Sequence, residues 1–254
     1  MYLYIYDAFL NDKKYLSLLN RIESRLADLE IKGKTCHLNI LKNMEEVVED
    51  GLRQGVKTVV AVGDDQTFSK IVNIIADKNV TLGIIPATND SKIAQILGIP
   101  PGEAACDILA QRLIRKLDLG KINHQYFLDS ATINNPNITL HFDKYQISPA
   151  TKHAVISLSN LGFLTSNQTV YKNKISIPND GLLEAVIAPL KTSLFSKTKK
   201  IKKQSIFQFK KIKITSKGEP AHVTIDQQAI FKTPIEVTVA PQKLKVIVGS
   251  KRLF

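Results

Sequence analysis

Two strand–loop–helix units follow one another in residues Thr58 to Pro100, TVVAVGDDQTFSKIVNIIADKNVTLGIIPATNDSKIAQILGIP. In the first unit an apolar run, Val59 to Val62, ends in the polar residues Gly63 to Thr67 and passes into a helical pattern. In the second unit Leu82 to Ile85 ends at Pro86 and a polar loop, after which a second helix begins. Two such units place two helix N-termini at one edge of a parallel sheet, which is where α/β folds bind phosphate.

The rest of the first half continues the alternation of strands and helices. Strands are predicted at Tyr2–Tyr6, Thr35–Ile40, Thr58–Val62 and Leu82–Ile85. Helices are predicted over an apolar stripe from Leu16 to Leu29 that ends at Gly33, and at Met44–Leu52, Gln66–Ala76, Ser91–Leu97 and Glu103–Arg115. Right-handed crossovers would join these elements into one doubly wound, Rossmann-like parallel sheet.

After residue 119 short β-rich runs, separated by polar or Gly/Pro/Asn turns, replace the helical periodicity. They lie at Gln125–Phe127, Ile138–Phe142, His153–Leu158, Leu183–Ile187, Phe207–Ile214, His222–Ile225, Ile235–Val239 and Leu244–Val248. The fold class predicted is therefore α/β. We expect an α/β nucleotide-binding domain over residues 1–119 and a β-sandwich domain over residues 120–254.

Composition excludes several classes of protein. The hydrophobic content of 44% and charged content of 23% are ordinary for a globular chain of 254 residues. The opening MYLYIYDAF lacks a basic region and a long apolar region, so it reads as a strand rather than a secretory signal. No apolar stretch approaches the roughly 20 residues that cross a bilayer. The only cysteines, Cys36 and Cys106, lack metal-like spacing and are expected to be reduced, packed thiols in a cytoplasmic protein.

The net charge of +12 is concentrated in one segment, Lys191 to Lys217, which contains ten lysines and no acidic residue. Such a segment attracts polyanions, although a solvated surface explains it equally well. Apolar residues such as Phe195 and Ile206 lie between the lysines, a combination that suits an anionic membrane surface. The segment has no Arg, Tyr or Trp for base contacts, so no specific nucleic-acid partner is expected.

The two loops resemble those of the catalytic domain shared by diacylglycerol kinases, sphingosine kinases and NAD kinases. The family's first loop is Gly-Gly-Asp-Gly-Thr, followed by a helix with Glu and Asn; the corresponding residues here are Gly63, Asp64, Asp65, Gln66 and Thr67, then Lys70 and Asn73. The family's second loop, Pro-x-Gly-Thr-x-Asn-Asp-Phe-Ala-Arg followed by Leu-Gly-Ile-Pro, falls on Pro86 to Pro100. Here Thr88, Asn89, Ser91 and Gln95 replace Gly, Thr, Asn and Arg.

Three further segments of the β-rich half resemble the same family, in the same order. They are Asp118–Asn123 at the start of the second domain, Asn179–Glu184 for an Asp-Asp-Gly-x-Leu-Asp segment, and Ile225–Gln228 for a late Asp-Gly-Glu. Thr233-Pro234 and the aliphatic run Leu244–Val248 follow, as in the family. The resemblance therefore extends over most of the chain.

The resemblance implies ATP and Mg²⁺ as cofactors and assigns the site residues. It places Asp65, Asp226 and Gln228 in catalysis, Asp180 and Asp226 at the metal, and Gly63, Asp64, Gln66, Thr67, Asn73, Pro86, Thr88 and Asn89 around the nucleotide. Asp64 and Gln66 stand where the family has glycine, and a carboxylate beside a triphosphate is repulsive unless a cation bridges them. Gln228 stands where the family has Glu, and an amide cannot take a proton at neutral pH.

Each candidate also has a purely structural explanation. Asp65 and Thr67 suit a helix cap, and Asn89 to Ser91 suit a turn and N-cap before Lys92. Asp180-Gly181 is a turn pair, and Asp226 suits a hairpin.

Several functions remain open. The first is ATP-dependent phosphorylation of a lipid hydroxyl in the cleft between the two domains, at the inner membrane surface, with the lysine-rich segment on anionic lipid. The second is a catalytically impaired relative that binds a nucleotide or anionic lipid, because both loops and the late acid are altered together. The third is a NAD-kinase-like enzyme with a soluble acceptor, and the fourth is a polyanion scaffold. An exposed strand edge in the β-rich half would support a homodimer.

Overall fold

The computed structural model describes residues 1–39, 42–151, 154–161, 177–193, 196–201 and 204–254, with backbone alone in 189–193 and 196–201. The chain divides into two compact units. Unit 1 contains Met1–Leu117 and Lys243–Phe254, and unit 2 contains Asp118–Gln242. The sequence placed everything after residue 119 in the second domain, whereas here the last twelve residues cluster with the first unit.

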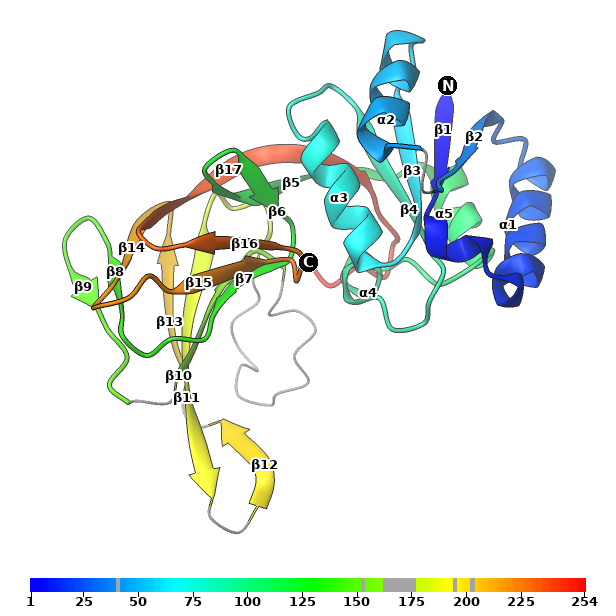
Figure 1. Cartoon of the computed structure of the whole chain (residues 1–254). Coiled ribbons are helices and arrows are strands. Elements are labelled where there is room, and N and C mark those ends of the chain that lie inside the picture. The colour runs from blue at the N-terminus through cyan, green and yellow to red at the C-terminus, as the bar shows by residue number, and fades with distance from the viewer. Residues whose placement is uncertain (40–41, 152–153, 162–176, 194–195, 202–203) are drawn as a thin grey trace. The chain divides into compact units, whose positions relative to one another are not determined.

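Unit 1 is built on parallel strands in the order β2-β1-β3-β4-β17. Its strands are β1 (Tyr2–Tyr6), β2 (Gly33–His37), β3 (Thr58–Gly63), β4 (Thr81–Pro86) and the end of β17 (Ile235–Ile247). Its helices are α1 (Leu16–Asp28), α2 (Met44–Arg53), α3 (Asp65–Ile75), α4 (Lys92–Leu97) and α5 (Ala104–Gln111), with short 3₁₀ turns at Ala8–Asn11 and Lys13–Tyr15. Helices α2 and α3 contact each other, as do α1 and α5, and Figure 1 shows the two pairs on opposite faces of the sheet.

Every residue of β3 and β4 is buried, because helices cover both faces of these central strands. The strands have continuous apolar sequences for the same reason. Helix α1 buries only the stripe Leu19, Ile22 and Leu26. The hydrophobic pattern of the sequence therefore matches the burial of the side chains in unit 1. The predicted α/β fold class is confirmed.

The elements that the structure describes in unit 2 are strands, and the first of them, β5, begins in unit 1. They are β5 (Ile114–Ile122), β6 (Gln125–Phe127), β7 (Ser130–Ile133), β8 (Ile138–His141), β9 (Gln146–Ile147), β10 (Ala154–Ser159), β11 (Leu183–Ser193), β12 (Ser196–Ile201), β13 (Ser205–Phe209), β14 (Lys211–Ser216), β15 (His222–Ile225), β16 (Ala229–Lys232) and the first part of β17. One sheet has the order β12-β11-β10-β7-β15-β16, with β13 beside β11, and the other joins β17, β14, β8 and β9. Inward residues of both sheets form one core, including Phe127, Ile156 and Ile212.

Several element boundaries differ from those predicted. The helix predicted over Glu103–Arg115 ends at Gln111, because Arg112 takes a left-handed conformation and β5 begins at Ile114. The predicted strand Phe207–Ile214 is two strands, and the runs Ile235–Val239 and Leu244–Val248 are parts of the single strand β17. Gly33 begins β2 instead of ending α1. Of the predicted strand His153–Leu158, His153 lies outside the described residues.

Both cysteines are free thiols. Cys106 is buried and burial raises its pKa to about 12, so the thiol is protonated at neutral pH, while Cys36 is half-buried. No helix among the described residues is long and apolar enough to cross a membrane.

The C-terminal residues of the chain terminate helix α4. Gly249 N–H donates to Leu97 O at 2.8 Å and Leu253 N–H donates to Ile96 O at 2.9 Å, so the tail satisfies two carbonyls at the helix end. Gly98, with φ +69°, allows this packing, because a Cβ there would lie 2.4 Å from Arg252 N. The Leu-Gly-Ile-Pro motif thus has a packing role.

We predict that Gly98→Ala destabilises the chain more than Gly55→Ala. Both glycines have a left-handed conformation, which costs an L-residue roughly 1–2 kcal/mol. A Cβ at Gly55 meets no atom within 4 Å, whereas at Gly98 it collides with the tail backbone, so the loss there should be larger by about 2 kcal/mol. Urea unfolding of the two variants measures the difference in the free energy of unfolding. Equal losses of stability would contradict the packing of the C-terminal residues against Gly98.

Candidate active site

The carboxyl ends of β1 and β3 meet at the switch point of the unit 1 sheet. Strand β2 lies on one side of β1 and β3 on the other, so connections leave in opposite directions there, and ligands of open α/β sheets bind at this place. Asp7 follows β1 and Asp64 follows β3. The Thr67 hydroxyl lies 2.7 Å from Asp7 Oδ2 and 3.0 Å from Asp64 Oδ1, so one hydroxyl links the two carboxylates.

The first loop is a capped strand-to-helix junction. Asp64 is the N-cap of α3, and its Oδ1 accepts from Thr67 N at 2.9 Å while Thr67 Oγ1 accepts from Asp64 N at 3.3 Å. The predicted cap at Asp65 is wrong by one residue, and the predicted capping role of Thr67 is confirmed. Gly63 must lack a Cβ, since one would lie 2.4 Å from Thr67 Oγ1.

The substitutions of glycine in this loop need no unusual backbone. Asp64 has φ −114°, an ordinary extended value, and Gln66 lies exposed in the first turn of α3. Neither residue has a positive φ. The backbone at Asp64 and Gln66 therefore does not need the conformational freedom of glycine. The two substitutions instead add a negative charge at Asp64 and a larger side chain at both positions.

Asp65 connects the first loop to the second. Its carboxylate accepts from Ser91 Oγ, from Lys92 N at 2.9 Å and from Ile93 N at 3.4 Å. Ser91 is the N-cap of α4, as predicted, and accepts from Ala94 N at 3.1 Å. A side chain of α3 thus neutralises the exposed N–H groups of α4. An external phosphate could bind these N–H groups only by displacing Asp65.

The second loop lies beside the first because β3 and β4 are neighbours, with Gly63 opposite Pro86. Ala87 N donates to Gly63 O at 2.8 Å, and Pro86 O accepts from Gly102 N at 2.9 Å. Beyond Pro86, Thr88 is half-buried and Asn89 is exposed. Their side chains make no hydrogen bond among the described residues, so they can contact a ligand.

Asn73 lies two turns into α3, away from the first turn that follows Asp64. Its Nδ2 donates to Ser69 O at 3.1 Å within the same helix, and the residue is half-buried. The structure brings the other residues predicted in unit 1 to one sheet edge, and Asn73 supports the helix behind them.

In unit 2, Asp226 fastens the β15–β16 turn to the residues before β7. Its Oδ1 accepts from Asp129 N at 3.1 Å and Ser130 N at 2.9 Å, and its Oδ2 accepts from Leu128 N at 3.0 Å. Asp226 N donates back to Ser130 O at 2.9 Å. The hairpin role weighed for Asp226 is therefore real, and three backbone donors already occupy its carboxylate.

Gln228 closes the same turn. Its N–H donates to Ile225 O at 2.8 Å, and the two central residues, Asp226 and Gln227, have φ values of +43° and +60°. A turn with two left-handed central residues matches the twist of a hairpin. Gln228 is half-buried.

Asp180 is an exposed turn residue whose Oδ1 accepts from Leu182 N at 2.9 Å. Desolvation raises its pKa, and the nearby Asp118 raises it further. Asp118 is fully buried; its Oδ1 accepts from Gln242 N at 2.6 Å and its Oδ2 from Gly181 N at 2.7 Å. Among the residues that the structure describes, no group of three or more His, Cys, Asp or Glu side chains is placed to hold a metal.

Two residues with central positions were given no site role by the sequence reasoning. Asp7 accepts a hydrogen bond from the Thr67 hydroxyl at the switch point, and Asp118 accepts one from Gly181 N. Asp7 directly follows a predicted buried strand, as Asp64 does, and that position was the available signal. Nothing in the sequence marks Asp118 as buried, because it lies within an alternating strand.

Comparison with known proteins identifies the origin of this arrangement. Residues 2–122 match the family model of the diacylglycerol kinase catalytic domain. The matched segment is slightly less than half of the chain. The predicted resemblance is confirmed, and the two loops of unit 1 are a divergent version of the family's loops.

Curated relatives are similar in sequence over part of the chain, and solved structures share its fold. The chain is 36% identical over 77 residues to a diacylglycerol kinase of Bacillus subtilis and 34% identical over 88 residues to a probable lipid kinase, YegS-like, of Pseudomonas aeruginosa. These segments cover 29% and 34% of this chain but only 25% and 29% of the relatives. A crystal structure of a diacylglycerol kinase from Bacillus anthracis shares the fold, with a TM-score of 0.77 and 17% identity over 99% of this chain and 97% of that one.

We predict that Asp65→Ala loosens α4, because the variant leaves Lys92 N and Ile93 N without their acceptor. The free energy of unfolding should fall by about 1–2 kcal/mol, and the two amides should exchange hydrogen faster. Asp90→Ala, an exposed carboxylate in the same loop, is the matched control and should change neither quantity. If the two variants behave alike, Asp65 does not hold α4.

We predict a larger loss for Asp226→Ala than for Asp180→Ala. The first removes the acceptor of three backbone donors and should cost about 3 kcal/mol, with faster exchange at Leu128, Asp129 and Ser130. The second removes the acceptor of one exposed turn amide and should cost about 0.5–1 kcal/mol. Urea unfolding with hydrogen exchange compares the two, and similar losses would show that the Asp226 hydrogen bonds contribute little.

Proposed function

We propose that the chain is an ATP-dependent phosphotransferase that acts on a lipid hydroxyl, as a diacylglycerol kinase does. One observation carries the proposal: Gly63 and Pro86 are neighbours on β3 and β4, so the two family loops meet at one sheet edge. Thr88 and Asn89 at that edge have side chains available for a ligand. The family is one of kinases, and this supports the phosphotransferase class.

In this proposal the nucleotide phosphates contact the two loops. Gln66 and Asn89 are exposed and offer amide donors. Gly63 and Thr67 shape the first loop from beneath, and Pro86 shapes the second. Asp65 then acts as a positioning residue, because its carboxylate fixes α4 relative to α3. Phosphoryl transfer depends chiefly on such positioning and on neutralisation of charge.

Mg²⁺, when bound, would supply that neutralisation of charge. The ion needs only one or two protein carboxylates, because water and phosphate complete its shell. Asp64 fits this requirement, since among the described residues its hydrogen bonds are all accepted by Oδ1. The exposed Asp180 of unit 2 is the other carboxylate proposed for a metal. Asp226 does not fit, because both of its oxygens accept backbone hydrogen bonds. Gln228 would orient an acceptor hydroxyl by hydrogen bonding without removing its proton.

A second candidate is a module that binds ATP or anionic lipid without transfer. It is favoured by Gln228, which stands where the family has Glu and cannot act as a base. A lipid acceptor would in either case bring the protein to the inner surface of the membrane. Much of the lysine-rich segment proposed for that contact, residues 191–203, lies outside the described side chains.

We expect transfer of labelled phosphate from ATP, with Mg²⁺, into one lipid of a total lipid extract. Asn89→Ala should lower the rate at least tenfold, because it removes a donor from the phosphate loop. Asn20→Ala, an exposed amide on α1, is the matched control and should leave the rate unchanged.

Calorimetric titration with ATP separates the two candidates. Labelled lipid establishes the kinase. Binding of ATP without label in any lipid contradicts the kinase and leaves the binding module. If the chain neither binds ATP nor labels a lipid, the result contradicts a role for the unit 1 loops in nucleotide binding.

A further inference from the structure

A lysine-lined groove of about 780 Å³ lies in unit 2. Its walls are the β8–β9 hairpin and the strands β13 and β14, with Glu236 of β17 at its edge. Strand β14 alternates strictly, with Ile212 and Ile214 buried in the core and Lys211 and Lys213 exposed. We call this feature the hairpin groove.

The hairpin groove is positively charged. Four lysines line it, at positions 144, 210, 211 and 213, against the two carboxylates of Asp143 and Glu236. Lys211 pairs with Glu236 at 2.8 Å. Lys144, Lys210 and Lys213 form no ion pair among the described residues. With four lysines and two carboxylates the lining has a net charge of 4 − 2 = +2, and its lysines come from the β8–β9 turn and from residues Lys210–Lys213.

Aromatic side chains lie among these lysines. Phe142 and Tyr145 stack at 4.8 Å between ring centroids across the hairpin turn, and Phe142 N donates to Tyr145 O at 2.9 Å. The Tyr145 side chain is 52% exposed although its ring is large and apolar. A tyrosine held in this way is suited to a boundary between water and an apolar phase.

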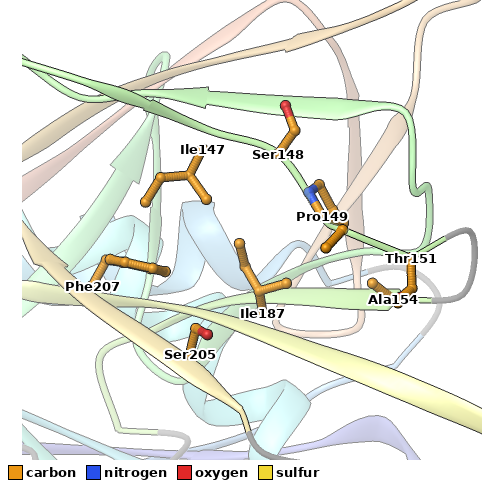
Figure 2. A pocket seen from close by; sticks show the side chains of 9 residues that line it. Ile147, Ser148, Pro149, Thr151, Ala154, Ile187, Ser205 and Phe207 are labelled. Atoms are coloured by element: carbon orange, nitrogen blue, oxygen red, sulfur yellow. The ribbon is translucent and has the colours of Figure 1, made fainter.

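An apolar pocket of about 170 Å³ is lined by Ile147 of the same hairpin and by the residues that follow it. Figure 2 shows Ile147, Ile187 and Phe207 around it, with Pro149 on the adjoining chain. The Phe207 ring, which lines the pocket, lies 6.0 Å between centroids from the Phe142 ring, which lines the hairpin groove. Charged and apolar binding surfaces are therefore adjacent.

We propose that the hairpin groove docks the chain on a bilayer that contains anionic phospholipid. Lys144, Lys210 and Lys213 contact lipid phosphates, and Tyr145 enters the interface. Lysine suits this role as a flexible point charge, and aromatic anchors add apolar contact. Nucleic acid fits less well, because the groove has no arginine and the ring of Phe142 is occupied by Tyr145.

This inference extends the proposed function and rests on it in one respect. An enzyme that phosphorylates a lipid must reach the bilayer in which that lipid lies. The inference names the surface that meets the lipid, on residues that the structure describes. The docking proposal is tested by binding to vesicles and the kinase proposal by transfer of labelled phosphate. Either proposal can therefore be contradicted without the other.

The experiment measures co-sedimentation of the full chain with phosphatidylcholine vesicles that contain 30% phosphatidylglycerol. The test variant is Lys144→Gln with Lys210→Gln and Lys213→Gln. The matched control removes the same charge from unit 1, at Lys13, Lys32 and Lys57, which are exposed and form no ion pair among the described residues. Tyr145→Ser tests the aromatic anchor, and thermal unfolding verifies that each variant is folded.

We expect the partition constant of the test variant to fall at least tenfold, since each lysine near an anionic surface contributes roughly fivefold. The control should lose less than threefold. Tyr145→Ser should lose severalfold, a loss that persists in 0.5 M NaCl, where lysine contacts are screened. No binding by the unmodified chain, equal losses in test and control, or stronger binding to RNA than to these vesicles would each overturn the proposal.

Discussion

The Asp65 carboxylate joins the helices that follow β3 and β4, and the geometry of the candidate site depends on this contact. It lies on α3 but accepts hydrogen bonds at the N-terminus of α4. The other end of α4 is held by the C-terminal tail through Gly249 and Leu253. The short helix is thus fixed at both ends by residues distant in sequence. Because α4 is held in place, the conformations open to the loop between Pro86 and Ser91 are restricted.

The same contact changes the electrostatics of the sheet edge. Asp7, Asp64 and Asp65 bring three carboxylates to the place where α/β proteins bind phosphate. Two unit charges about 4 Å apart, at an effective dielectric of 20, repel by about 4 kcal/mol. Protein hydrogen bonds compensate these carboxylates in the free chain, but a triphosphate would add charge of the same sign. Nucleotide binding here is therefore expected to depend on a divalent cation more strongly than in a glycine-rich loop.

The strands β3 and β4 and the helices that follow them could be predicted from sequence, because hydrophobic periodicity and burial agree there. The apolar runs of β3 and β4 and the N-cap at Ser91 could each be inferred locally. The partner of Asp65 could not, because a carboxylate within one turn of a helix start fits its own cap as well as a neighbour's. The continuation of β17 into unit 1 was also beyond local reasoning, since two runs separated by Pro241 resemble two strands.

Unit 2 shows how a motif can persist for structural reasons. The family's Asp-Gly-Glu places glycine where this chain has Gln227, and that residue has φ +60°, a conformation that glycine adopts freely. The chain accepts the strain at Gln227 yet retains Asp226, whose carboxylate binds three backbone N–H groups. Loss of such an acceptor exposes three donors at once, which is costly whether or not phosphate is transferred. Retention of Asp226 is therefore accounted for by folding, and the evidence for catalysis has to come from the residues at the edge of unit 1.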